Sequence, residues 1–191
     1  MSAAQQSSAA EWFEPGLLAR RLGHGVSEEL VAEMLGHARL RLGLDRLLSR
    51  RAGPAEACTL LALDRIGLLA FLRRLGAVWN APDLTRAIDG TAVRELVAAV
   101  GPSLRQAAIR HAALLPAHHP RRGLSVAELV RQIPIDGLAC LTAWADTRPD
   151  AIRTRIELRV GRADVIDFAQ RTHAPGLVEA LAEMASAPEA A

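Results

Sequence analysis

The chain has 191 residues, of which half are apolar, 23% are charged and only 3% are aromatic. This length suits one domain or two small ones, and the apolar fraction is too high for a disordered chain, which lacks the apolar surface that offsets the entropy of ordering. The longest uncharged apolar runs, such as residues 66–72, are far shorter than the ~20 residues that a membrane-spanning helix needs. We therefore expect a soluble, globular protein.

The basic residues are all arginine. The 23 arginines stand against 21 acidic residues, and the chain contains neither lysine nor tyrosine. Leu, Ala and Arg are strong helix formers, whereas the residues favoured in strands are scarce, so the composition predicts an all-α fold. The net charge of +2 is only a weak indication of nucleic-acid binding, because such proteins normally gather positive charge on one face.

Residues 13–185 are predicted to form a single compact domain of about nine or ten short helices, between flexible tails at residues 1–12 and 186–191. The first helix is expected to begin at Pro15 and to end near Gly23. A longer helix is expected to follow the N-cap Ser27 and to continue to about residue 48, since apolar residues recur there with a period of about 3.6.

Capping residues, prolines and glycines predict the elements in the middle of the chain. The most apolar stretch, residues 55–79, is expected to hold two helices or one broken helix, with Asp64 as the N-cap in between. A short helix is expected at 83–88, and Thr91 fits as the N-cap of the next. The segment 116–123, with two prolines and a glycine, is predicted to be a loop.

The last third begins with a strong local signal. Ser125 and Glu128 fit a capping box, which predicts a helix start. Pro134 is expected to end this helix, and a new one is expected to start after it. Residues 155–160 alternate between polar and apolar side chains, which leaves one short strand open there. The terminal helix is expected over residues 177–185.

No catalytic motif is present. The chain lacks a GxSxG sequence and a P-loop, and it has no lysine for Schiff-base chemistry. Asp64, Asp89 and Asp136 are better explained as cap or turn residues than as general acids and bases. We therefore expect no enzyme, no catalytic residue, no cofactor and no small-molecule substrate.

The histidines are candidate metal ligands. His111, His118 and His119 could supply imidazoles, but two of them lie in the 116–123 loop and no cysteine is close in sequence, whereas zinc sites need three or four rigidly held ligands. A solvated loop is the better interpretation, so no metal is expected. Cys58 and Cys140 lie in separate apolar stretches and are expected to be buried structural thiols. Without a secretory signal at the N-terminus, the cytoplasm fits best.

Residues 124–144 mimic a helix-turn-helix. The recognition helix of that motif presents polar or basic side chains to base edges. Here the second helix offers Gly137, Leu141 and Trp144, and its first charge is the acidic Asp136. Such a helix belongs in a core. A DNA-binding regulator remains the alternative function, supported by the pI near 9.0 and by Arg121-Arg122.

Arginines flank apolar residues in the stretch from 73 to 94. Arg and Trp are enriched at protein–protein hot spots, where a planar cation and a large ring bury area at low entropic cost. Spacing alone favours a solvated helix face with Trp79 in the core, and a docking face is the alternative. The partner-binding candidates are Arg73, Arg74, Trp79, Asp83, Arg86, Asp89 and Arg94.

A series of short motifs favours the docking face. In order, they are Leu63-Asp64, Gly67-Leu68-Leu69, Arg73-Arg74-Leu75-Gly76, Asn80-Ala81-Pro82 and Arg86-Ala87-Ile88-Asp89-Gly90. Further along come Gly137, Leu141, Pro149, Arg153, Arg155 and Leu158. In this order the chain resembles the SctK family, the YscK-like accessory proteins of bacterial type III secretion systems, over roughly residues 55–160.

The resemblance implies a non-enzymatic, mainly helical, cytoplasmic adaptor of the injectisome sorting platform. In that family the protein links the cytoplasmic domain of the inner-membrane ring protein (SctD) to the platform scaffold protein (SctQ). The expected partners are therefore SctQ-like and SctD-like proteins, with no nucleic acid, and the membrane is approached only through the ring. Because arginine pairs bidentately with carboxylates, acidic patches on these partners are plausible contacts for Arg73, Arg74, Arg86 and Arg94.

Overall fold

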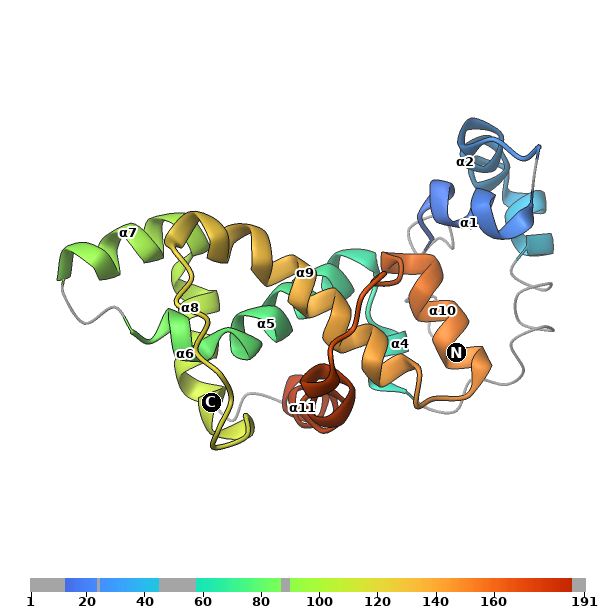
Figure 1. The fold of residues 1–191 in the computed structure, drawn as a ribbon. Helices are drawn as coiled ribbons and strands as arrows, with labels where there is room; N and C mark the ends of the chain where they lie inside the picture. The colour runs from blue at the N-terminus through green and yellow to red at the C-terminus, as the bar shows by residue number, and fades with distance from the viewer. Residues whose placement is uncertain (1–12, 24, 45–57, 87–89, 187–191) are drawn as a thin grey trace. The chain divides into compact units, whose positions relative to one another are not determined.

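The computed structural model describes residues 13–23, 25–44, 58–86 and 90–186. Every regular element within these residues is a helix (Figure 1). This confirms the all-α fold predicted from the abundance of Leu, Ala and Arg. The predicted tail at 1–12, and 187–191 of the predicted tail at 186–191, lie outside the described residues.

The chain divides into two compact units, each of which has its own buried residues. Unit 1 comprises Met1–Leu68 and Arg148–Gly161, and unit 2 comprises Leu69–Thr147 and Arg162–Ala191. The single domain predicted over residues 13–185 stays a prediction.

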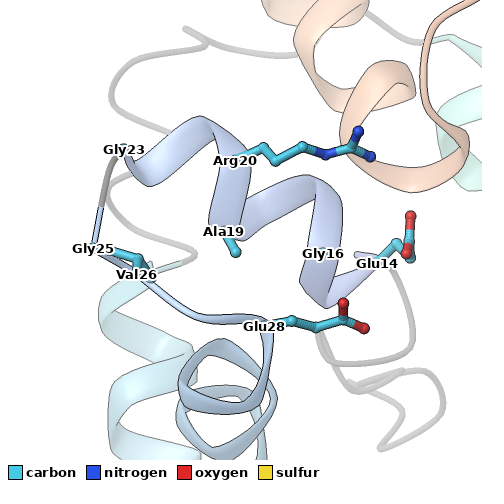
Figure 2. Close-up of a pocket in the computed structure, with 8 residues that line it drawn as sticks. All are labelled: Glu14, Gly16, Ala19, Arg20, Gly23, Gly25, Val26 and Glu28. Carbon is cyan, nitrogen blue, oxygen red and sulfur yellow. The ribbon is translucent and has the colours of Figure 1, made fainter.

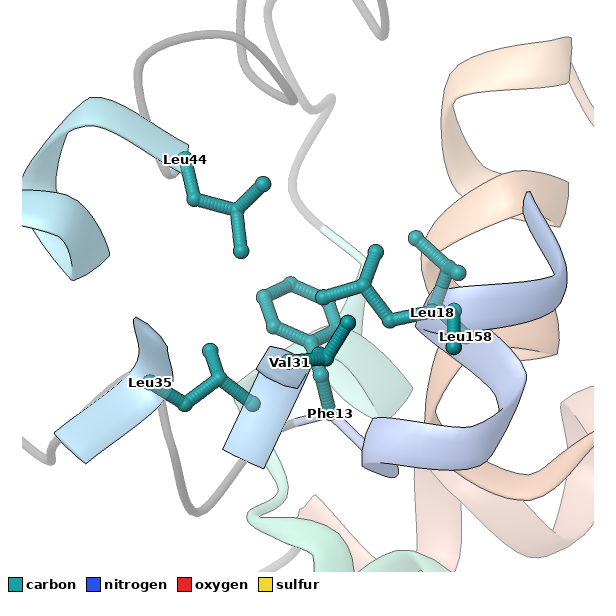
Figure 3. Packing of buried hydrophobic residues seen from close by; sticks show 7 residues of the cluster. Phe13, Leu18, Val31, Leu35, Leu44 and Leu158 are labelled. Carbon is teal, nitrogen blue, oxygen red and sulfur yellow. The ribbon is translucent and has the colours of Figure 1, made fainter. Parts of the chain in front are cut away.

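Unit 1 is built from short helices around one apolar cluster. Its helices are α1 (Pro15–Leu22), α2 (Glu28–Gly36), the helical residues 38–44, α4 (Thr59–Ala62) and α10 (Asp150–Val160). Ser27 is the N-cap of α2 as predicted, since its hydroxyl accepts a hydrogen bond from the Leu30 amide at 3.2 Å. Figure 3 shows the apolar cluster of this unit, which consists of Phe13, Leu18, Ala19, Val31, Leu35, Leu44 and Leu158.

The prediction of one continuous helix from Ser27 to about residue 48 is wrong. It breaks at His37, whose backbone is extended (φ −90°, ψ 115°), and helix resumes at residue 38. Gly36 weakens the helix at this point, because glycine costs about 1 kcal/mol relative to alanine in a helix interior. The break allows Leu35 and Leu44 to join the same cluster.

The short strand left open at 155–160 is also wrong, because these residues belong to α10. The buried side chains of this helix include Ile152, Ile156 and Arg159, whose spacing of four and three residues is helical. Arg159 is only 2% exposed, and its Nη1 donates to the carbonyls of Leu61 (3.2 Å) and Leu63 (3.0 Å). Because Arg159 is charged yet buried, the apolar residues alone did not show the helical period of this segment.

Unit 2 contains both long and short helices. They are most of α5 (Arg65–Trp79), α6 (Ala81–Leu84), α7 (Gly90–Val100), α8 (Pro102–His111), the short 3-10 helix η2 (Ala112–Leu114), α9 (Val126–Ala145) and α11 (Phe168–Ser186). The predicted cap at Asp64 precedes α5, where its carboxylate accepts from the Gly67 amide at 2.6 Å. The predicted capping box also forms, with the Ser125 amide 2.8 Å from Glu128 Oε2.

Within the described residues, unit 2 has buried cores in two places. One lies among α5, α6, α7, α8 and the first half of α9 and contains Ala77, Ala81, Leu84, Leu96, Ala108, Leu129 and Ile133. The other lies where α11 packs against α9 (Figure 1). Its buried residues on α11 include Ala174, Leu177, Val178 and Leu181. Burying such side chains contributes roughly 1.5–3 kcal/mol for each large aliphatic one.

Two prolines that were expected at helix boundaries lie inside helices. Pro134 lies inside the continuous α9, and Pro175 lies inside α11, which begins well before residue 177. The helix-turn-helix proposed for 124–144 is therefore wrong, because a single helix spans the predicted turn. Because proline has no N–H, Pro134 leaves the Val130 carbonyl without its helical hydrogen bond. Both residues are exposed, so water can satisfy that carbonyl.

The helices α5 and α9 cross at two glycines. A Cβ on Gly76 would lie 1.9 Å from the Ile133 carbonyl oxygen, and a Cβ on Gly137 would lie 2.1 Å from the Leu72 carbonyl oxygen. No real Cβ tolerates such distances to backbone atoms, so both positions require glycine. The crossing fixes α5, which carries the first of the predicted docking residues.

Candidate docking surface

The predicted docking residues separate into buried and exposed groups. Trp79 and Asp83 are buried at 3% and 6% exposure, and Arg74 is half-buried. Arg73 and Arg86 are exposed. The structure therefore does not place these side chains on one open face, and each group has a different role. Asp89 lies outside the described residues.

Trp79 ends α5 in the interior of unit 2. Its ring meets the His119 ring edge-on, with centroids 4.4 Å apart and planes at 77°. The Trp79 carbonyl accepts a hydrogen bond from His119 Nε2 at 2.9 Å. Burial lowers the pKa of His119 below its ordinary value, an effect larger than the opposing one of this hydrogen bond. Trp79 thus holds the 116–123 loop and is not an exposed hot spot.

Asp83 fixes the end of the same loop. Its two carboxylate oxygens accept from the backbone amides of Arg122 (3.1 Å) and Gly123 (2.9 Å). Gly123 has a φ of +67°, which favours glycine and turns the chain toward α9. The predicted loop is confirmed, but it is tied down by hydrogen bonds and is not simply solvated.

Asp136 accepts hydrogen bonds from four side chains. It is 3% exposed inside α9, and its carboxylate pairs with the Arg122 guanidinium. It also accepts from Asn80 Nδ2 (2.9 Å), Gln132 Nε2 (3.1 Å) and Gln170 Nε2 (3.3 Å). Asn80 further accepts from Arg122 Nη2 at 2.7 Å. Such a fully bonded buried charge joins Asn80, which follows α5, to α9, α11 and the 116–123 loop.

The assignment of Asp136 to a turn or cap was therefore wrong, and the sequence offered a signal. A lone carboxylate among apolar residues on a buried helix face requires donors, because an unpaired buried charge is very costly. The Arg122 side chain was recognised only as a positive charge on the loop. Its position in the sequence, fourteen residues before Asp136, gave no indication of the pairing.

Arg74 makes a different kind of contact. Its Nη2 lies 3.0 Å from Nε2 of His111, a residue of α8 that is 7% exposed. Because a guanidinium carries no acceptor, His111 accepts through Nε2 and is neutral. Burial, and then the positive charges of Arg74 and Arg110, lower the pKa of His111 below its ordinary value. Neither Arg110 nor His111 was among the predicted docking residues.

The exposed arginines differ in their freedom. Arg94 folds back onto its own helix α7, where it donates to the Gly90 carbonyl (3.2 Å) and to the Thr91 hydroxyl (3.3 Å). Thr91 lies inside this helix, which begins at Gly90, so its prediction as the N-cap was wrong. Within the described residues, Arg73 and Arg86 have no ion pair.

The two cysteines differ in burial. Cys140 is fully buried in α9, and burial raises the pKa of its thiol well above the ordinary value, as expected for a structural thiol. Cys58 is only half-buried. Neither forms a disulfide.

A hollow of about 540 Å³ lies beside α1 and the start of α2 in unit 1. Figure 2 shows its lining residues, Glu14, Gly16, Ala19, Arg20, Gly23, Gly25, Val26 and Glu28. The charged side chains among them are two carboxylates and one guanidinium. None of these lining residues offers a nucleophile.

The described part of the chain holds neither a metal-ligand cluster nor a membrane-spanning helix. No three His, Cys, Asp or Glu side chains there come together as the ligands of a metal would. No helix in that part is long and apolar enough to pass through a bilayer.

The chain resembles curated proteins over most of its length. It is 31% identical over 162 residues to the nodulation protein NolU of Rhizobium fredii, and the alignment covers 81% of this chain and 73% of that protein. The nodulation protein NolU of Sinorhizobium fredii is 30% identical with the same coverage. No protein-family model and no solved structure matches the chain.

Proposed function

Because the chain belongs to the family of the nodulation protein NolU, we propose that it is a component of a bacterial type III secretion system. More narrowly, it acts as a non-enzymatic adaptor of the cytoplasmic sorting platform. The motif order over residues 55–160, which resembles the SctK family, supports this narrower role. The relationship to NolU extends over 81% of this chain.

The observation that carries the adaptor role is the contrast within one short segment of unit 2. Trp79 and Asp83 are buried and hold the 116–123 loop. Arg73 and Arg86, a few residues to either side, are exposed and have no acidic partner within the described residues. A rigid framework that presents free guanidinium groups suits recognition of carboxylates on another protein.

In this role the chain links two proteins. One is the platform scaffold, an SctQ-like protein, and the other is the cytoplasmic domain of the inner-membrane ring, an SctD-like protein. The chain lies at the inner-membrane face of the apparatus through the ring protein. It needs no cofactor and no small-molecule substrate for this task.

The test is a pull-down of the full chain with the scaffold protein and with the cytoplasmic domain of the ring protein of the same organism. We expect the unmodified chain to retain at least one of them. A variant with Arg73 and Arg86 changed to Glu should lose that partner. The control is Arg171→Glu, which reverses one exposed charge on α11. Unchanged binding by the Arg73 and Arg86 variant would refute the docking surface.

A further inference from the structure

The contact between α5 and α8 gathers positive charge on a small area. Arg74 of α5 and His111 of α8 are hydrogen-bonded at 3.0 Å. Arg110 is the preceding residue of α8, and its charge, like that of Arg74, disfavours a proton on His111. Arg73, the exposed neighbour of Arg74, adds a further guanidinium on the same turn of α5. Arg74 and Arg110 therefore lie at or beside one neutral imidazole, and Arg73 is the exposed residue next to Arg74.

Among the described residues, no carboxylate pairs with the arginines of this area, in contrast to other arginines of the chain. Arg122, Arg153 and Arg162 pair with aspartates, at Asp136, Asp150 and Asp146 respectively. Within the residues that the structure describes, none of Arg73, Arg74 and Arg110 has such a pair. The guanidinium of Arg74 instead donates to the uncharged His111, and its Nε is buried without a hydrogen-bond partner.

An anion from outside the chain would complete this arrangement. Like charges close together repel, and a carboxylate placed between guanidinium groups turns that repulsion into attraction. The planar guanidinium matches a carboxylate with two parallel hydrogen bonds, which an imidazole cannot offer. A nucleic acid is a poorer match as the ligand. A protein that binds DNA contacts about 6–10 phosphates, far more than three arginines can reach. The whole chain also carries a net charge of only +2.

We infer that Arg73 and Arg74 of α5, together with Arg110 of α8, bind an acidic segment of a partner protein, with carboxylates of that segment seated on these guanidinium groups beside His111. The inference deepens the proposed adaptor function and rests on it for the nature of the partner. It adds Arg110 to the docking surface, and it excludes Arg94, which is bonded to its own helix.

The test measures binding of a short fluorescent peptide rich in glutamate to the full chain by fluorescence anisotropy. The same peptide with glutamine in place of glutamate is the uncharged comparison. We expect the glutamate peptide to bind more tightly than the glutamine peptide, and its affinity to fall as salt is added. Arg73→Glu and Arg110→Glu change exposed residues, so they should leave the fold intact, and each should weaken binding about tenfold.

Arg171→Glu is the matched control, since it makes the same change of charge at an exposed position of another helix. Its affinity for the glutamate peptide should equal that of the unmodified chain. Equal affinity of Arg110→Glu and the unmodified chain, or an equal loss in Arg171→Glu, would overturn the inference. So would tighter binding of a short DNA duplex than of the peptide, because the surface would then be one for nucleic acid.

The outcome is separable from that of the proposed function. If the platform proteins fail to bind but the peptide binds through Arg110, the docking surface stands and the adaptor role fails. If the platform proteins bind equally well to Arg110→Glu, the adaptor role stands and the inferred surface is wrong.

Discussion

Gly76 of α5 and Gly137 of α9 occupy the same helix crossing, and each makes room for the backbone of the opposite helix. Their hypothetical Cβ atoms would lie 1.9 Å and 2.1 Å from carbonyl oxygens of that helix. Asn80, one turn beyond Gly76, donates to the Gly76 carbonyl and to Asp136, which precedes Gly137. Close packing and a buried hydrogen-bond network therefore stabilise the same crossing.

Gly76→Ala is expected to destabilise the protein by about 3 kcal/mol or more, at or beyond the upper end for overpacking, because the added methyl group meets backbone and not a movable side chain. Urea unfolding followed by circular dichroism measures the change. Gly176→Ala in α11 is the matched control, since nothing lies within 4 Å of its Cβ position. This control should raise stability by roughly 0.5–1 kcal/mol. Equal stability of the two variants would contradict the crossing.

Asp136→Asn should destabilise the protein by about 3 kcal/mol. This value is at the lower end for breaking a buried ion pair, because the Arg122 side chain keeps 35% of its exposure. The new amide NH2 would also donate toward side chains that are themselves donors, where the carboxylate oxygen accepted from them. The same change at Asp150, whose pair with Arg153 is exposed, should alter stability by no more than about 0.5 kcal/mol. Similar losses in both variants would show that the buried network is not what stabilises unit 2.

Trp79→Ala should lower stability by about 3–5 kcal/mol, because it leaves a cavity in the core and removes the ring that packs on His119. Thermal unfolding measures this loss. Arg73→Glu, by contrast, changes an exposed side chain and should leave the melting temperature unchanged. A stable Trp79→Ala variant that nevertheless loses a partner would instead identify Trp79 as a binding residue.

The stability of the protein should fall as the pH is lowered through the range of histidine titration. Burial lowers the pKa of both His111 and His119 from the ordinary value of 6.5, so the unfolded chain binds protons before the folded one does. Stability is therefore greatest above that value and is lost as the pH falls below it. The depressed pKa of the Glu128 carboxyl, at the capping box, adds a further loss only in a more acidic range, below 4.5.

Urea unfolding at about pH 8 and about pH 5.5 measures this dependence. The double variant His111→Gln with His119→Gln should show a smaller difference between the two conditions than the unmodified chain. His118→Gln, at an exposed position of the same loop, should not reduce it. An unchanged pH dependence in the double variant would contradict the assigned protonation of these two residues.

Local signals in the sequence predicted local structure well. Ser27, Asp64 and Ser125 were recognised as helix caps because a cap depends on a few neighbouring residues. The all-α fold followed from composition for a similar reason, since helix propensity is a property of single residues.

Long-range packing decided the rest, and single-sequence patterns do not contain it. Pro134 and Pro175 lie within helices because packing along α9 and α11 stabilises them beyond the loss of one backbone hydrogen bond each. Arg159 occupies a buried helical position because the carbonyls of unit 1 satisfy it. In the docking segment, spacing correctly favoured Trp79 in the core, but its contact with His119 and the burial of Asp83 could not be predicted, because the partners lie about 40 residues away, in the 116–123 loop.

An adaptor must hold two proteins at once, and size-exclusion chromatography of a three-component mixture tests this requirement directly. The full chain would be mixed with the SctQ-like scaffold protein and with the cytoplasmic domain of the SctD-like ring protein of the same organism. We expect one complex that contains all three, and we expect the scaffold and ring proteins not to co-elute when the chain is left out. Co-elution with neither protein, or displacement of one by the other, would contradict the adaptor role.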